Sequence, residues 1–483
     1  MSDMRSTEVL VVGAGVLGCA VALRLADGGV RVALVAPLTD RRGHASRAAG
    51  AMLGVFSEVS SHDEPWRRDV EVGERLQARR LYDDWVADLA ERSGIGVAVA
   101  PGLFVVANAE GENDERELQA VADAASSHGC RAELHSWRDV PGLAPERRSP
   151  PLSALELPDE GSIDASLLLD ALEGALVRHS LVEVVQARVT SLAPGPTGEI
   201  TARLDSGAER RASQVVLAAG VETTQLMLAS EQLEAGLPPI LSGRGVSILV
   251  RAPLALPTAI RTPNRSFACG LHLVPRSGGC VYVGATNRLS TAPSVDRGPT
   301  LDELATLVDG AVRQFNTSLR HAELMATAVG HRPVTVDRLP LVGRTRDPRV
   351  LVASATYRNG ILLAPRVAEI LAGEVLQPGS ATGHPFSPQR ELKVPGGLEA
   401  LTGWTGRGLL AQLTASDGRL APGRDEELER FLQLALSSLL VDGPVDDGLR
   451  RKLARLWERA PLEEVLPLIF ETVARHGGKP EKA

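Results

Sequence analysis

The chain has 483 residues, 44% of them hydrophobic and 47 of them glycines, so it is long enough for two or three globular units with cores of their own. Its formal net charge of -8 is spread without long charged blocks, which argues against a nucleic-acid surface. No apolar run approaches the roughly 20 residues that span a bilayer. We therefore expect a soluble protein without nucleic-acid or membrane partners. The polar lead at residues 1–7 has no apolar segment or cleavage site, which favours the cytoplasm.

Cysteine and lysine usage excludes several kinds of chemistry. The cysteines are Cys19, Cys130, Cys269 and Cys280. They lie far apart and show no Cys-x-x-Cys or Cys/His spacing, so neither a metal site nor a disulfide framework is expected. Every lysine follows residue 390, so no lysine in the main body is able to form a Schiff base.

A strand, a tight turn and a helix are predicted at the start of the chain. The apolar run at residues 9–12 breaks directly into Gly13, Gly15 and Gly18, and a helical pattern follows over residues 19–26. Gly13 permits the turn, Gly15 lets the backbone approach a pyrophosphate, and Gly18 allows the helix to pack closely. The helix N-terminus adds unpaired N–H groups and the positive end of its dipole. This stretch therefore predicts a dinucleotide-binding site.

The next elements carry one departure from that pattern. A second strand at residues 31–35 ends at Ala36, where dinucleotide-binding folds place an acidic residue against a ribose hydroxyl, and Asp40 is the nearest substitute. The small residues of 43–54 are typical of a helix start beneath something flat and closely approached, although a packed helix start alone would also explain them. Residues 71–92 have the apolar spacing of an amphipathic helix.

The chain then leaves this domain and returns to it twice. Short alternating strands begin after Gly94 and again between residues 246 and 286, which indicates two visits to a mainly β domain. Helices are predicted at 115–127, 166–178 and 367–375, strands at 182–185, 189–192 and 350–354, and a buried strand at 214–217. A third segment, 330–365, again delivers a glycine turn to a helix start. Two such turns, both suited to anions, indicate a large bound cofactor.

Five stretches together resemble the FAD-dependent D-amino-acid-oxidase superfamily, and within it the glycine oxidases. They are the opening glycines, residues 48–54, residues 283–286, residues 332–343 from Arg332-Pro333 to Gly343, and residues 358–365 from Arg358 to Pro365. The resemblance covers about residues 7–390. It implies an α/β fold in which a doubly wound, Rossmann-like FAD-binding domain is interleaved with a substrate domain built on an antiparallel β-sheet. The FAD-binding segments would be about 1–95, 150–235 and 326–390, and the substrate-domain segments about 96–149 and 236–325.

The same resemblance implies the positions that contact a non-covalent FAD. Besides the opening glycines, these are Val16, Leu17, Ser46, Gly50, Ala51, Met52 and Val189. The loop at the isoalloxazine would be Thr356, Tyr357, Arg358, Asn359, Gly360, Ile361 and Leu362. Because no cysteine lies in residues 330–363, we expect acid to release the flavin.

Three side chains are candidates for catalysis. Arg332 resembles the family's carboxylate-binding arginine and Arg358 resembles a second residue of the substrate pocket, roles that suit a planar bidentate donor. His272 stands where glycine oxidases have an active-site tyrosine, so the carboxylate partner or the substrate is expected to differ. The alternatives are surface arginines and a histidine buried in the core.

The expected reaction is oxidative deamination of a primary or secondary amine that carries a carboxylate. If Arg332 fixes the carboxylate so that the Cα–H faces flavin N5, hydride passes directly, and no general base is needed when the amine binds neutral. The resemblance implies that water hydrolyses the imine and that O2 reoxidises the flavin, giving H2O2. Two alternatives stay open: a FAD dehydrogenase with a protein or other electron acceptor, and a flavin-poor scaffold that binds a partner.

An added module follows the part of the chain that the resemblance covers. Residues 395–397, Pro-Gly-Gly, are typical of a linker, and helical patterns up to residue 476 predict a helical C-terminal extension at 396–483. So few helices bury limited area by themselves. We expect them either to pack on the body or, through residues 396–476, to form a homo-oligomer or bind a protein partner.

Overall fold

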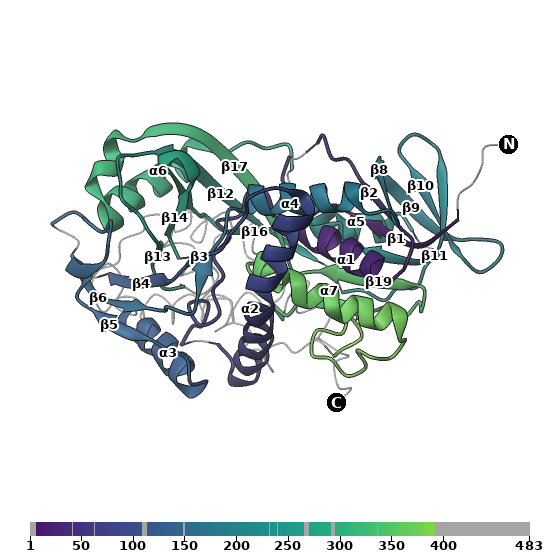
Figure 1. Cartoon of the computed structure of the whole chain (residues 1–483), viewed down its shortest axis with the longest axis horizontal. Helices are drawn as coiled ribbons and strands as arrows, with labels where there is room; N and C mark the ends of the chain where they lie inside the picture. The colour runs from purple at the N-terminus through teal and green to yellow at the C-terminus, as the bar shows by residue number, and fades with distance from the viewer. Residues whose placement is uncertain are drawn as a thin grey trace, which may run out of the picture.

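The computed structural model describes residues 6–391, apart from 41, 62, 109–113, 148–149, 231, 239, 265–269, 291–294 and 336. The predicted extension at 396–483 therefore lies outside the described residues, and so does Cys269. Two large sheets lie side by side along the long axis of the molecule, with helices around them (Figure 1). Within the described residues, no helix is both long and apolar enough to cross a membrane.

The first sheet has eight strands in the described part of the chain. Its path is β18 (Leu341–Arg344), β19 (Val350–Ser354), β11 (Glu209–Leu217), β1 (Ser6–Val12), β2 (Val32–Ala36) and β8 (Val182–Gln186), and β10 (Ile200–Leu204) and β9 (Val189–Pro194) extend from β11. β1 pairs in parallel with β2 and β11, and β8 and β19 continue the parallel pairing on either side. The apolar run of β1 thus lies at the sheet centre, where strands are buried on both faces.

Successive side chains of β1 point alternately into two different hydrophobic cores. One face of the sheet packs against four helices: α1 (Val16–Asp27), α2 (Pro65–Ser93), α4 (Ala165–Arg178) and α7 (Gly360–Leu376). The other face packs against β9, β10 and α5 (Thr223–Leu228). Val9 and Val11 point to the helices, and Leu10 and Val12 point to the opposite layer. Four consecutive apolar residues therefore anchor both layers.

The second sheet has nine strands in the described part of the chain. Its path is β16 (Arg288–Ser290), β12 (Leu241–Arg251), β15 (Cys280–Gly284), β14 (His272–Arg276), β13 (Ala259–Arg261), β4 (Leu103–Asn108), β6 (Pro151–Glu156) and β5 (Glu133–His135), and β17 (Glu323–Val334) pairs with β12. Helix α3 (Asp114–Ser127) packs on one face and α6 (Leu301–Gly310) on the other. β3 (Ala100–Pro101) and β7 (Gly161–Ser162) form a separate short pair.

Two strands near the expected domain boundaries pair in the second sheet. β6 and β17 both belong to the second sheet, so the chain changes sheets after Glu156 and after Val334 rather than near 150 and 326. The proline-rich stretch 141–158 concealed β6, in which Pro151 takes the first position, where a missing N–H is tolerated. The division into two domains stays a prediction.

Two helices begin earlier than the sequence predicted. α2 starts at Pro65 rather than at residue 71. Proline has no N–H, but it is tolerated at the start of a helix, because the N–H groups of the first turn have no partner within the helix. α7 starts at Gly360 rather than at residue 367 and contains Pro365. Its first turn therefore joins the loop that the resemblance places at the flavin.

Candidate active site

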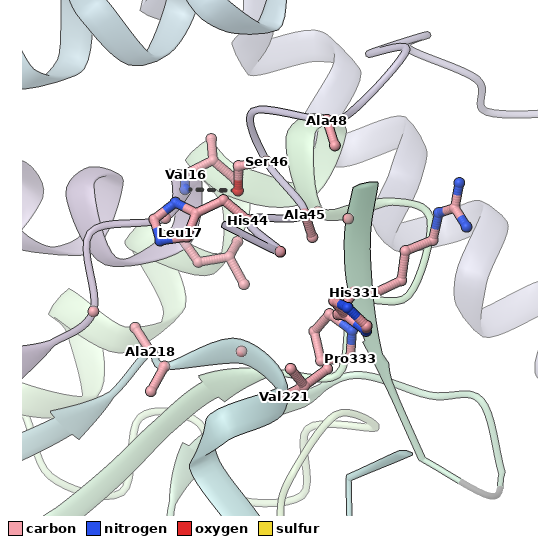
Figure 2. A pocket seen from close by; sticks show the side chains of 18 of the residues that line it. Val16, Leu17, His44, Ala45, Ser46, Ala48, Ala218, Val221, His331 and Pro333 are labelled. Atoms are coloured by element: carbon pink, nitrogen blue, oxygen red, sulfur yellow. Dashed lines mark hydrogen bonds between the residues drawn. The ribbon is translucent and has the colours of Figure 1, made fainter. Parts of the chain in front are cut away.

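Elements of both sheets line a cavity of about 590 Å³. The turn from β1 to α1, residues 43–52, the end of β11 and the N-terminus of α7 contribute to it, and β17 contributes residues 330–333. Figure 2 shows the cavity from close by, with His44 and Ser46 above and His331 and Pro333 below. The volume lies in the range of small-molecule and cofactor sites.

The turn from β1 into α1 leaves no room for a side chain at Gly13 or at Gly18. Gly13 has a φ of +108°, and a Cβ on it would overlap the carbonyl oxygen of Ala218. A Cβ on Gly18 would overlap the carbonyl oxygen of Gly13. Ser46 reaches across and accepts a hydrogen bond from the backbone N–H of Val16 at 3.1 Å, in the first turn of α1 (Figure 2). A helix N-terminus that the backbone approaches this closely is suited to a phosphate group.

Most of the positions that the sequence analysis assigned to FAD line this cavity: Gly13, Gly15, Val16, Leu17, Ser46, Gly50, Ala51, Met52, Val189, Thr356, Tyr357, Arg358, Gly360 and Ile361. Three others do not line it. Gly18 packs against Gly13, Asn359 precedes the first residue of α7, and Leu362 is buried in the core. The role of each position as a FAD contact stays a prediction.

Arg332 reaches the cavity from β17. Its Nη1 donates to the carbonyl oxygen of Thr286 and to Oδ1 of Asn287, both at 3.1 Å. The guanidinium lies over Gly245 of β12, where any Cβ would overlap it. Within the described residues no carboxylate forms an ion pair with Arg332, and its Nε and Nη2 donate no hydrogen bond to the protein. Its charge and two of its donor atoms are therefore available to a ligand.

Two other arginines of the cavity share one carboxylate. Glu58 forms an ion pair with Arg261 and lies 3.2 Å from Nε of Arg358. Oδ1 of Asn264 accepts hydrogen bonds from Arg261 and, at 2.7 Å, from Arg358. Burial raises the pKa of the Glu58 carboxyl, but the charges of the two arginines outweigh burial and hold that pKa well below its ordinary value. Arg358 thus reaches the cavity with a carboxylate already beside it, and its role toward a substrate stays a prediction.

His272 lies in the same cavity and is 5% exposed. Its Nδ1 donates to the carbonyl oxygen of Gly270 at 2.9 Å, and its ring stacks on Tyr282 with the centroids 5.6 Å apart. Burial lowers the pKa of His272 to about 3, and the charges of Arg261 and Arg332 contribute to the lowering. Because a carbonyl oxygen only accepts, the proton of the neutral ring sits on Nδ1, and Nε2 is a hydrogen-bond acceptor.

Comparison with known families identifies this architecture. A family model described as FAD dependent oxidoreductase matches residues 8–374. The chain belongs to this family. It is therefore a FAD-dependent oxidoreductase, which confirms the enzyme class, the cofactor, the resemblance and the α/β fold class expected from the sequence. We set the flavin-poor scaffold aside.

Two relatives and one solved structure are informative. The glycine oxidase of Geobacillus kaustophilus is 31% identical over 392 residues, which are 80% of this chain and 97% of that protein. Its crystal structure matches with a TM-score of 0.69 at 27% identity, over 80% of this chain and 100% of that chain. The bifunctional protein ThiO/ThiG of Synechocystis sp. is 28% identical over 399 residues, which are 80% of this chain and 54% of that protein.

The residues of the cavity fit FAD. Gly13 and Gly18 leave the N-terminus of α1 open to a pyrophosphate, and the cavity continues from there to the N-terminus of α7. Ala36 lines the cavity at the end of β2, so that strand supplies no carboxylate to a ribose. The carboxylates that line the cavity nearby are Asp40 and Glu222, and each is paired with an arginine, at 2.8 and 2.7 Å.

Sequence reasoning missed several residues of this FAD-dependent oxidoreductase site: Glu58, Arg261, Asn264, Tyr282 and Asn287. Most of them follow no recognisable spacing, and tertiary packing alone brings them together. Tyr282 and Asn287 are the exceptions, because they directly precede and follow residues 283–286, a stretch that carried the resemblance. Reading one residue further on either side would have found them.

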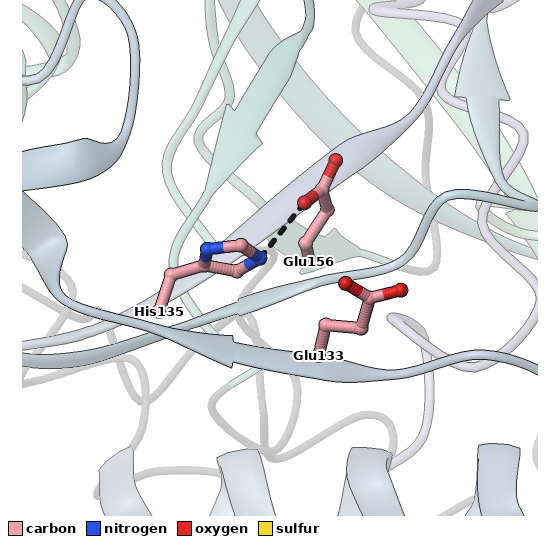
Figure 3. Close-up of side chains that lie close together, drawn as sticks. All are labelled: Glu133, His135 and Glu156. Atoms are coloured by element: carbon pink, nitrogen blue, oxygen red, sulfur yellow. Dashed lines mark ion pairs between the residues drawn. The ribbon is translucent and has the colours of Figure 1, made fainter.

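One group of side chains away from the cavity has the composition of a metal site. Glu133 and His135 lie on β5, and Glu156 stands opposite Glu133 on β6 (Figure 3). Their ligand atoms lie within 4.8 Å of one another, and Nε2 of His135 is 2.8 Å from the carboxylate of Glu156. The pair with Glu156 already gives the ring of His135 a partner within the protein. We therefore assign no metal to these three residues, and the expectation that the protein holds no metal stays a prediction.

Proposed function

We propose that this FAD-dependent oxidoreductase oxidises a small primary or secondary amine that carries a carboxylate. The observation that carries the proposal is Arg332, which lies in the cofactor cavity with no carboxylate partner among the described residues. A guanidinium with two unused donor atoms matches the two oxygens of a carboxylate. The similarity to a glycine oxidase supports the same substrate class.

Bound FAD would accept a hydride equivalent from the substrate Cα and pass the electrons to O2, giving H2O2. The chain's own residues hold and orient the substrate. Arg332 binds the carboxylate, and Nε2 of His272 accepts a hydrogen bond from the amine. Neither His272, whose pKa is about 3, nor Glu58, whose pKa is also far below neutral, takes up an ammonium proton near pH 7. The amine must therefore lose its proton to solvent before oxidation, after which water hydrolyses the imine.

The test is an assay of the full-length, FAD-loaded protein over glycine, sarcosine, D-amino acids and larger amino-acid conjugates. We expect peroxide to form with at least one of them and turnover to disappear in Arg332→Ala. Turnover with an artificial dye but without peroxide would assign the protein to the dehydrogenases. No turnover of any amine with either acceptor would overturn the proposal.

A further inference from the structure

Asn287 lies behind the substrate end of the cavity rather than in its lining. It is 8% exposed and follows β15 by three residues. Its Oδ1 accepts a hydrogen bond from Nη1 of Arg332 at 3.1 Å, and its Nδ2 donates to the hydroxyl of Tyr357. Arg332 and Tyr357 both line the cavity. One buried amide thus joins the proposed carboxylate anchor to the loop expected at the flavin.

The donors and acceptors fix the orientation of this amide. A guanidinium only donates, so the side of Asn287 that faces Arg332 must be its oxygen. The NH2 group then faces Tyr357, whose hydroxyl oxygen accepts. An asparagine satisfies both neighbours at once, whereas an aliphatic side chain would satisfy neither.

Strand β12 makes room for the whole arrangement through two glycines. A Cβ on Gly243 would lie 3.0 Å from the ring of Tyr357 and 3.1 Å from Oδ1 of Asn287, and a Cβ on Gly245 would overlap the guanidinium of Arg332. Residues two apart on a strand share one face. Gly243 and Gly245 therefore form a floor on which Arg332, Asn287 and Tyr357 lie close to the backbone.

The two kinds of arginine partner in this cavity differ in charge. Arg261 and Arg358 share the carboxylate of Glu58, whereas Arg332 is held by a carbonyl oxygen and a neutral amide. A carboxylate at position 287 would hold Arg332 equally well, but it would compete with the carboxylate of a ligand. The neutral amide orients the guanidinium and leaves its charge for the ligand.

We propose that Asn287 is a positioning residue that orients Arg332 for the substrate carboxylate without neutralising it, and that it ties this anchor to Tyr357. The inference rests on the proposed function, because it takes Arg332 as the carboxylate anchor. It assigns Asn287 no contact with the substrate or with the reacting atoms.

The experiment measures binding separately from turnover. Acetate, a carboxylate without an amine to oxidise, is titrated into the FAD-loaded full chain while the flavin absorbance is followed. Loss of a hydrogen bond to a charged group predicts a Kd for acetate about tenfold higher in Asn287→Ala. In Asn287→Asp the introduced carboxylate pairs with Arg332, and we expect a Kd at least about a hundredfold higher. The FAD content should stay that of the wild type.

The order of the two variants separates positioning from simple packing. Aspartate has the shape of asparagine, so a residue that only fills space would be damaged more by alanine than by aspartate. Asn316→Ala, which removes another buried amide, is the matched control and should leave the Kd for acetate unchanged. If Asn287→Ala folds poorly, Tyr357→Phe, which removes the acceptor of Nδ2, should raise the Kd in the same direction by a smaller factor.

The outcomes of this experiment and of the substrate assay are distinct. Acetate binding that weakens in the order wild type, alanine, aspartate supports the positioning role even if no amine is oxidised, in which case only the proposed function fails. An amine oxidase whose acetate Kd is unchanged in both variants, or weaker in alanine than in aspartate, overturns the positioning role and leaves the proposed function standing.

Discussion

The hydroxyl of Tyr82 donates a hydrogen bond to the carbonyl oxygen of Ile361 at 3.2 Å. Ile361 lies in the first turn of α7, and Pro365, four residues later, has no N–H to give to that carbonyl. Tyr82 supplies the missing donor from α2. Its side chain is fully buried, and burial raises the pKa of Tyr82 far above its ordinary value, so the hydroxyl keeps its proton.

We expect Tyr82→Phe to lower the free energy of unfolding by about 1–3 kcal/mol, because the buried carbonyl of Ile361 would then have no donor. Urea denaturation of the FAD-loaded protein measures the loss. The same substitution is then made in a protein that already carries Pro365→Ala, in which the alanine N–H is able to donate to the carbonyl of Ile361. Tyr82→Phe should cost much less in that background. An equal cost in both backgrounds would mean that the hydrogen bond is not the cause.

This pair also explains why the start of α7 could not be predicted from the sequence. A proline normally ends or delays a helix, so the sequence favoured a start at residue 367. The compensating hydroxyl comes from a residue 279 positions away. The strand, turn and helix around Gly13 were predictable because all of their determinants are adjacent in the chain.

The residues of the candidate site also differ in whether the sequence could predict them. Arg332 and Arg358 were recognisable because each belongs to a stretch that carries the family resemblance, and His272 because it stands where glycine oxidases have an active-site tyrosine. Glu58, Arg261 and their hydrogen-bond partners were not, because the sequence separation between Glu58 and Arg261 is 203 residues and neither belongs to a motif. Their pairing decides which arginines of the cavity have a carboxylate beside them, and only the structure reveals it.

Arg332→Ala should lower kcat/KM for the best amine by at least about a thousandfold while FAD stays bound. Removing one partner of a buried charge pair costs several kcal/mol, and each 1.4 kcal/mol is a factor of ten. Peroxide assays give the kinetics, and the absorbance of the purified protein gives the FAD content. Arg251→Ala, an exposed arginine paired with exposed Glu323 on the neighbouring strand, is the control and should leave both unchanged. Wild-type kinetics in Arg332→Ala would remove this residue from the site.

His272 should make the protein less stable in mild acid. Its pKa is about 3 when folded and about 6.5 when unfolded, so between these values the unfolded state binds the extra proton. The contribution of His272 to stability therefore rises with pH across this window, by up to about 1.4 kcal/mol per pH unit, and at pH 5 it is about 2 kcal/mol smaller than at pH 8. The measurement is the free energy of unfolding of the FAD-loaded protein from pH 5 to pH 8.

His272→Gln removes the titrating ring and should flatten this dependence. His321→Gln, which changes an exposed histidine, is the control and should keep the wild-type slope. Glu58 adds little slope in this window, because the pKa of its carboxyl is about 4.5 when unfolded, below pH 5, and lower still when folded. Equal slopes in the wild type and in His272→Gln would show that the histidine is not held neutral.

A cut after residue 391 should leave an active FAD-dependent oxidoreductase, whereas a cut before Arg390 should make the protein clearly less stable. All cavity-lining residues precede residue 362. Arg390 donates to both carboxylate oxygens of Asp337 at 2.9 and 2.8 Å, and to the carbonyl oxygens of Leu339 and Pro340. Asp337 is 1% exposed at its side chain, so losing Arg390 leaves a buried carboxylate unpaired and should cost about 3–5 kcal/mol.

The two truncations therefore separate loss of the body's own contacts from loss of the residues beyond 391. We expect 1–391 to bind FAD and turn over like the full chain, and 1–389 to unfold at clearly lower urea concentration. Light scattering then tests the oligomer predicted to form through 396–476. A smaller assembly with intact turnover in 1–391 supports that interface. An unchanged mass rules out a homo-oligomer built through those residues, and insoluble 1–391 would mean that they pack on the body instead.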